Sequence, residues 1–144
     1  MPSDDPCRTP PPRVLLIMPE QWPRALLRAA LRELGYDAVG APSLAAALHF
    51  PVDAPERGAV RLVLLDQATL ADEEAASQLE LLLRRHREPA PMLLSRAMPA
   101  TALPPAAATV AWRRVLHRPV SVGDLVAAIQ AVAPLPPGSQ RPLD

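Results

Sequence analysis

Few residues of this chain are placed where they could do chemistry, and their spacing limits what that chemistry is. Asp66 directly follows the apolar run Val60 to Leu65, so a carboxylate stands at the end of an expected strand. The three histidines are not spaced as metal ligands are. No G-x-G-x-x-G motif or P-loop occurs, and the loop Met18 to Gln21 has no glycine that would let the backbone approach a phosphate. The group to explain is therefore the carboxylate.

The elements that would position Asp66 alternate between strand and helix patterns. Short continuous apolar runs predict strands buried on both faces, whereas one-sided apolar patterns predict helices. Pro104 and Pro105 interrupt the place of a helix at 98–108, which we expect to be short, disrupted or absent. This order predicts an α/β fold with a flavodoxin-like, doubly wound, five-stranded parallel sheet, (βα)5. Strands are expected at 13–18, 36–41, 60–65, 92–94 and 110–116, and the other helices at 23–34, 43–49, 72–87 and 121–132.

The ends of the chain are rich in proline, which defeats both helix and sheet hydrogen bonding. Residues 1–12 and 134–144 are therefore predicted to be disordered tails around one domain, 13–133. A chain of 144 residues is long enough for one domain with a core of its own.

Charge and hydropathy point away from several classes of partner. Fifteen arginines, with no lysine, balance fifteen acidic residues, so no overall field favours nucleic acid or anionic membranes. No apolar run approaches the roughly 20 residues of a membrane-spanning helix. Cys7 has no partner within the chain, which fits a reducing compartment. We expect a cytoplasmic protein that binds neither nucleic acid nor membrane, and its alanine- and proline-rich composition resembles that of GC-rich bacterial genomes.

Three stretches resemble the receiver (CheY-like) domains of response regulators. Arg13 to Ala38 is similar to the first strand and helix of that family. Val60 to Gln67 resembles the third strand, with Asp66 at the phosphoacceptor position. Val115 to Ile129 resembles the fifth strand, the lysine–proline step and the last helix. The resemblance implies a role in signal transduction by two-component systems.

The same resemblance exposes departures at the functional positions. Receivers carry two adjacent acidic residues after the first strand, where they bind a divalent cation. Met18 and Pro19 stand at those positions, with Glu20 adjacent, and neither a thioether nor a proline ring can coordinate a hard cation. Arg118 and Pro119 take the lysine–proline positions, so the cation becomes a planar guanidinium.

Two further positions follow from the resemblance. The hydroxyl position of the fourth strand is expected at Ser95, although counting back from Arg118 gives Arg96. The switch position, normally aromatic, falls at Val115. The two tryptophans, Trp22 and Trp112, are expected to be packing residues.

The chemical consequence concerns phosphoryl transfer to a carboxylate, which depends mainly on positioning and on neutralisation of charge by a metal and a cation. Without the acidic pair, binding of Mg²⁺ is expected to be lost or weak. We expect no cofactor, no catalytic residue and no enzymatic activity. Asp66 can instead form an ion pair with Arg118, which would imitate one signalling state permanently.

The favoured interpretation is a stand-alone, degenerate receiver (a pseudo-receiver) that acts by phosphorylation-independent protein–protein contact. Its partner would be a histidine kinase, another signalling protein or a second copy of the chain, because no output domain is expected after Val132. One alternative is a functional single-domain response regulator phosphorylated on Asp66 with an unusual metal arrangement. It depends on whether Glu20, with Asp37 or Glu33 nearby, can supply oxygens around Asp66. Another is a small-molecule binder that uses the carboxyl ends of the strands.

Overall fold

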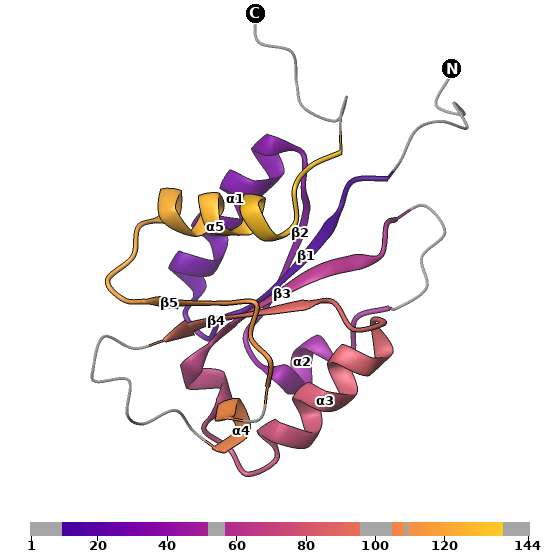
Figure 1. The fold of residues 1–144 in the computed structure, drawn as a ribbon, viewed down its shortest axis with the longest axis vertical. Helices are drawn as coiled ribbons and strands as arrows, with labels where there is room; N and C mark the ends of the chain where they lie inside the picture. The colour runs from indigo at the N-terminus through magenta and orange to yellow at the C-terminus, as the bar shows by residue number, and fades with distance from the viewer. Residues whose placement is uncertain (1–9, 52–56, 96–104, 109, 137–144) are drawn as a thin grey trace, which may run out of the picture.

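The computed structural model describes residues 10–51, 57–95, 105–108 and 110–136. Five parallel strands form one sheet in the order β2-β1-β3-β4-β5 (Figure 1). This confirms the expected flavodoxin-like sheet. The strands are β1 (Arg13–Ile17), β2 (Asp37–Ala41), β3 (Val60–Asp66), β4 (Ala90–Ser95) and β5 (Arg114–His117).

Helices cover both faces of the sheet (Figure 1). On one side lie α1 (Gln21–Leu34) and α5 (Val122–Val132), and on the other α2 (Leu44–Ala47), α3 (Ala75–Arg85) and α4 (Pro105–Ala108). The short 3₁₀ helix η1 (Gln67–Leu70) follows β3. Of the expected helix at 98–108, the single turn α4 is described, and residues 98–104 lie outside the described residues.

The core consists of two clusters, one on each side of the sheet. Side chains of β1 alternate between them: Val14 and Leu16 pack towards α1 and α5, whereas Leu15 and Ile17 pack towards α2 and α3. All five residues of β1 are buried, as expected for a central strand covered on both faces. The continuous apolar runs of the sequence therefore reflect burial on both sides.

The two long helices on the first face end and begin as their sequences predict. Pro23 lies in the first turn of α1, and Gly35 ends this helix with a φ of 110°, a conformation that glycine adopts without strain. The Ser121 hydroxyl accepts a hydrogen bond from the Asp124 N–H and so caps α5. Leu34, the last residue of α1, is exposed.

Several boundaries differ from those expected. β5 begins at Arg114 instead of Val110, because pairing with β4 starts where Arg114 meets Met92. α3 begins at Ala75 and ends at Arg85, and it is followed by two residues with positive φ, Arg87 and Glu88. Residues 1–9 and 137–144 of the expected tails lie outside the described residues.

The structure also tests what the sequence predicts for Pro12, Trp22 and Trp112. Pro12, expected in the disordered tail, is buried, and its carbonyl accepts a hydrogen bond from the Asp37 N–H at 3.0 Å. Trp22, expected to pack, is 76% exposed. Trp112 does pack against the second core cluster, and its indole N–H donates to the Ala107 carbonyl.

Among the described helices, none is long and apolar enough to cross a membrane.

Candidate functional site

The carboxyl edge of the sheet brings together the residues that the sequence singles out. Asp66 is the last residue of β3, Ser95 is the last residue of β4, and Arg118 follows β5. Met18 follows β1. Because all five strands run parallel, their carboxyl ends meet at one edge, where doubly wound sheets place their functional groups.

Asp66 is engaged through both carboxylate oxygens. Its Oδ2 accepts a hydrogen bond from Nη2 of Arg118 at 2.5 Å, which is also an ion pair. Its Oδ1 accepts from the N–H of Ala68 at 2.9 Å and so caps η1. The Asp66 side chain is 2% exposed, so these contacts replace the water that a free carboxylate would bind. The ion pair expected between Asp66 and Arg118 is present.

Ser95 makes two contacts with residues that surround Asp66, namely Gln67 and Arg118. Its hydroxyl donates to Oε1 of Gln67 at 3.0 Å, and its carbonyl accepts from the Arg118 N–H at 3.1 Å. The alternative for the hydroxyl position, Arg96, lies outside the described residues. Gln67 was not a candidate from the sequence, and the only signal that could have marked it is its place directly after Asp66.

Met18 faces the core instead of the site. Its side chain is 1% exposed and packs in the cluster that β1 shares with α1 and α5. The polar contacts of Met18 are made by its backbone: its N–H donates to the Ala41 carbonyl, and its carbonyl accepts from Nη1 of Arg24 at 2.6 Å. Pro19 and Glu20 are exposed, and the Glu20 side chain makes no capping hydrogen bond to α1.

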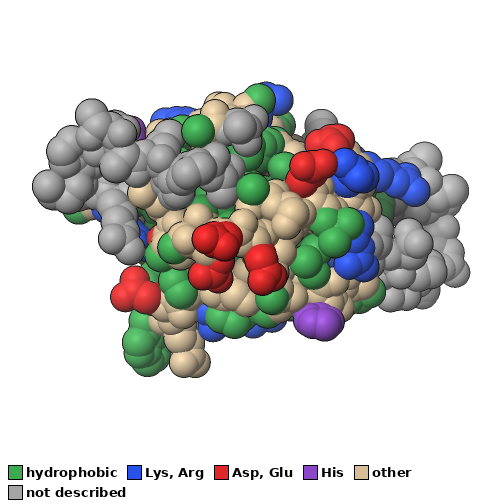
Figure 2. Space-filling view, turned by 90° about the horizontal axis from the view of Figure 1, so that it is seen from below, with side chains coloured by type: hydrophobic (Ala, Val, Ile, Leu, Met, Phe, Trp, Pro, Cys, Tyr) green, Lys and Arg blue, Asp and Glu red, His purple; other side chains and the backbone are tan. Residues whose placement is uncertain are grey.

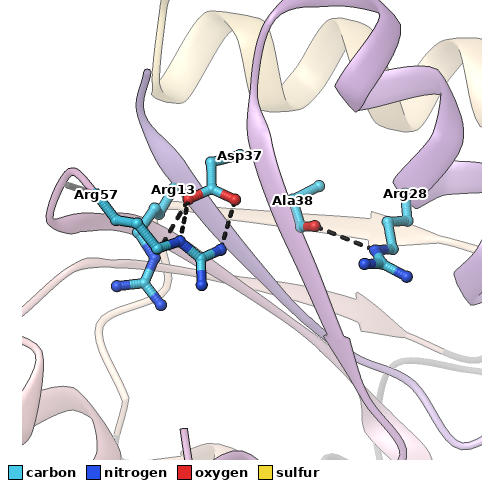
Figure 3. A network of polar contacts seen from close by, with 5 residues as sticks. All are labelled: Arg13, Arg28, Asp37, Ala38 and Arg57. Atoms are coloured by element: carbon cyan, nitrogen blue, oxygen red, sulfur yellow. Dashed lines mark hydrogen bonds and ion pairs between the residues drawn. The ribbon is translucent and has the colours of Figure 1, made fainter. Parts of the chain in front are cut away.

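Asp37 and Glu33 lie at the opposite edge of the sheet, so neither supplies the oxygens near Asp66 that the response-regulator alternative would need. Asp37 begins β2, and its carboxylate accepts from Nε and Nη2 of Arg57 at 2.8 and 2.6 Å (Figure 3). Nε of Arg13 lies 3.6 Å from the same carboxylate. The hydrogen bonds from Arg57 hold the pKa of Asp37 below its ordinary value. Glu33 lies in the last turn of α1, which leads into β2 at this same edge.

The residues present do not fit a divalent cation at Asp66. Such an ion needs several oxygen ligands, yet Met18 and Pro19 offer no side-chain oxygen. Both oxygens of Asp66 already accept hydrogen bonds. Within the described ranges, no three His, Cys, Asp or Glu side chains are grouped closely enough to hold a metal ion.

The remaining candidate positions lie on and after β5. Val115 is partly buried and packs against the core on the side of α3, in register with Leu93 of β4. Pro119 is exposed, and its peptide bond with Arg118 is cis. Arg113 precedes β5 and Arg118 follows it, so these two arginines lie at opposite edges of the sheet.

Comparison with solved structures reveals the class to which this fold belongs. A response regulator from Thermotoga maritima matches with a TM-score of 0.64 and 16% identity, over 85% of this chain and 97% of its own. The chemotaxis protein CheY4 of Vibrio cholerae matches with a TM-score of 0.66 and 14% identity, over 85% and 98%. An adenylate cyclase from Rhodopirellula baltica matches with 0.66 and 17%, over 84% and 86%. No protein-family model and no curated protein matches the chain in sequence.

The fold is therefore that of a response-regulator receiver (CheY-like) domain. At identities below one fifth, these three similarities establish the fold alone. The function of the site depends on its own residues.

Proposed function

We propose that this chain is a degenerate receiver that acts in signal transduction through protein–protein contact, without phosphorylation of Asp66 and without enzymatic activity. The observation that carries the proposal is the state of the Asp66 carboxylate. One oxygen is held by Arg118 and the other by the Ala68 N–H, within a nearly fully buried side chain. A phosphodonor would have to displace the guanidinium from the oxygen that it holds.

The residues at the expected metal-binding positions support the same conclusion. Phosphoryl transfer needs the developing negative charge to be neutralised by a positioned metal and a cation. Arg118 supplies a cation, but the positions of the acidic pair hold a buried thioether and a proline ring. We therefore propose that the chain binds Mg²⁺ weakly or not at all.

A protein partner is supported by the exposed apolar surface of α1. Trp22 is 76% exposed and Leu26 is 54% exposed. They are four residues apart on one helix and so share a face. Exposed aromatic residues are enriched at protein interfaces and often carry much of the binding energy. We propose that this face of α1, beside the carboxyl edge, takes part in binding a signalling protein such as a histidine kinase or a second copy of the chain.

The second candidate function is a working response regulator phosphorylated on Asp66. It is favoured by the convergence of a carboxylate, a hydroxyl and a cation at one edge, from Asp66, Ser95 and Arg118. This arrangement keeps part of the expected receiver site. The two functions therefore differ in whether Asp66 accepts a phosphoryl group.

Intact-mass measurement separates these two candidates. The full chain is incubated with Mg²⁺ and a small-molecule phosphodonor, beside the variant Asp66→Asn. We expect no phosphate-sized gain in mass for either protein. A gain that appears in the natural chain and is absent from Asp66→Asn would overturn the proposal and establish the second candidate.

A further inference from the structure

A hollow of about 610 Å³ lies at the amino edge of the sheet, opposite the edge that carries Asp66. Its walls come from residues before β1, at the start of β3, between α3 and β4, before β5 and after α5. Its volume lies within the range of roughly 300–1,000 Å³ that small-molecule sites occupy. The proposed receiver function makes no use of this hollow.

Three arginines from different elements line the hollow: Arg61, Arg87 and Arg113. All three are exposed, and within the described parts of the chain their side chains form no hydrogen bond or ion pair. Among the described residues that line the hollow, Glu88 is the single acidic one. These described residues of the lining therefore carry an excess of positive charge, although the chain as a whole is neutral.

The local backbone places each of these arginines at the hollow for an identifiable reason. Arg61 is skipped in the pairing of β3 with β1, because Arg13 pairs with Val60 and Val14 pairs with Leu62. Such a bulge leaves one residue unpaired and turns its side chain away from the regular alternation.

The other two arginines are fixed by the turns into β4 and β5. Arg87 and its neighbour Glu88 have φ values of 64° and 58°, a conformation that is uncommon and costly outside glycine. The N–H of Arg113 donates to the Pro91 carbonyl at 2.9 Å, which anchors the residue at the beginning of the sheet edge.

The rest of the lining suits a compact anion. Six prolines form part of the wall, which offers apolar, conformationally stiff surface without N–H donors. His86 also lines the hollow, and burial, followed by the charges of Arg13 and Arg85, lowers its pKa. The guanidinium groups of the arginines are thus the charged donors available to a ligand, and their planar forks match carboxylate and phosphate oxygens.

The surface elsewhere explains how a neutral chain carries this basic hollow. On the face seen in Figure 2, acidic side chains gather near the start of α3, where Asp72, Glu73 and Glu74 are exposed. That segment follows η1 and so lies towards the carboxyl edge. Part of the acidic charge that balances the arginines therefore lies away from the hollow.

We infer that the amino-edge hollow is a binding site for a small anion that carries two or more phosphate or carboxylate groups, held by Arg61, Arg87 and Arg113. This site is separate from the proposed receiver function, and either can fail without the other.

A nuclear magnetic resonance titration of the full chain tests the site, with pyrophosphate and citrate as separate probes at about 150 mM salt, where charges more than about 8 Å apart are largely screened. We expect saturable shifts at the amides of Arg61, Arg87 and Arg113, with dissociation constants from about 10 μM to 1 mM. The imidazole signals of His86 should shift with the same constant. Those of His49 and His117, which lie outside the hollow, should not.

Charge-neutral variants supply the matched control. Arg61→Gln and Arg113→Gln should each weaken binding about tenfold, because each removes one charge-assisted contact. Arg114→Gln removes the same charge one residue away from Arg113, outside the lining, and should change binding less than about twofold. The tighter of the two probes shows whether the ligand is a phosphate or a carboxylate compound. The site is overturned if neither probe saturates, or if Arg114→Gln weakens binding as much as Arg113→Gln.

Discussion

Met18 stands where the resemblance to receivers places a metal-binding carboxylate, and its side chain belongs to the core. It is buried between β1 and the pair α1 and α5, while its backbone groups bond to Ala41 and Arg24. An acid at this position would have to turn out of the core or be buried without a partner, and both cost free energy. Having Met18 in place of an acidic residue therefore changes the packing of the core and also removes a metal ligand.

Shortening Met18 should cost stability in proportion to the cavity that it leaves. We expect Met18→Ala to lower the free energy of unfolding by about 2–4 kcal/mol, as for other truncations of buried side chains. The matched variant Met18→Leu keeps the volume and should cost less than about 1.5 kcal/mol. Denaturant unfolding measures both values. Equal and small losses would show that Met18 is not a core residue.

His86 gives the chain a stability that depends on pH near neutrality. It is 5% exposed, and burial together with the nearby Arg13 and Arg85 lowers its pKa. Above the ordinary value of about 6.5 the imidazole is neutral in both the folded and the unfolded chain. Below that value the unfolded chain binds the proton more readily, so the free energy of unfolding falls as the pH drops towards the lowered pKa of the folded state.

Substitution of His86 should remove its contribution to the change of the unfolding free energy with pH. We expect His86→Gln to flatten the fall of the unfolding free energy below pH about 6.5, measured by urea titrations at several pH values. Asp37 acts in a separate and lower window, because its pKa is lowered and its contribution is lost only under more acidic conditions. An unchanged slope in His86→Gln would contradict this assignment.

At the scale of elements, helix ends that carry their own signals were predictable from the sequence. Gly35 and Ser121 mark the end of α1 and the start of α5 through local backbone chemistry, which does not depend on the rest of the fold. The start of β5 depends instead on its pairing with β4, and the apolar residue Val110 before it packs against the core without entering the sheet. Propensity alone could not reveal that difference.

The site could be predicted in its main residues and not in its details. The resemblance to receivers placed Asp66 and Arg118 together at one edge, and their opposite charges were then enough to expect the ion pair that the structure contains. The contacts of Gln67 and Arg24 depend on how two loops turn, and the sequence carries no local signal for this. Asp37 was misplaced because it begins a strand, whereas the site lies where strands end.

The cap of α5 offers a test of how far this last helix depends on its own sequence. Ser121→Ala removes the oxygen that accepts from the Asp124 N–H, and we expect a loss of about 1 kcal/mol in the free energy of unfolding. Ser77→Ala, inside α3, removes a serine that does not cap a helix and should cost no more than about 0.5 kcal/mol. Thermal or denaturant unfolding of the two variants measures the difference, and an equal effect would show that the cap contributes nothing.

At the scale of the molecule, the two edges of the sheet have different characters. The carboxyl edge holds the Asp66–Arg118 pair, and the amino edge holds the partly buried cluster of Arg13, Asp37 and Arg57 beside an arginine-lined hollow. The fold is that of a receiver, so these differences come from side chains placed on a shared scaffold. The proposed loss of phosphorylation rests on the replacement of the acidic pair by Met18 and Pro19 at the carboxyl edge.

Whether Arg118 holds Asp66 in place of a metal can be measured by a double-mutant cycle of Asp66→Asn and Arg118→Gln, with and without Mg²⁺. Arg118→Gln should cost more than Asp66→Asn, because it leaves a buried carboxylate without its cation. We expect a coupling of about 1–2 kcal/mol in the free energy of unfolding, since Arg118 is partly exposed, and no change when Mg²⁺ is added. A coupling near zero, or a stabilisation by Mg²⁺ that disappears in Asp66→Asn, would contradict this account.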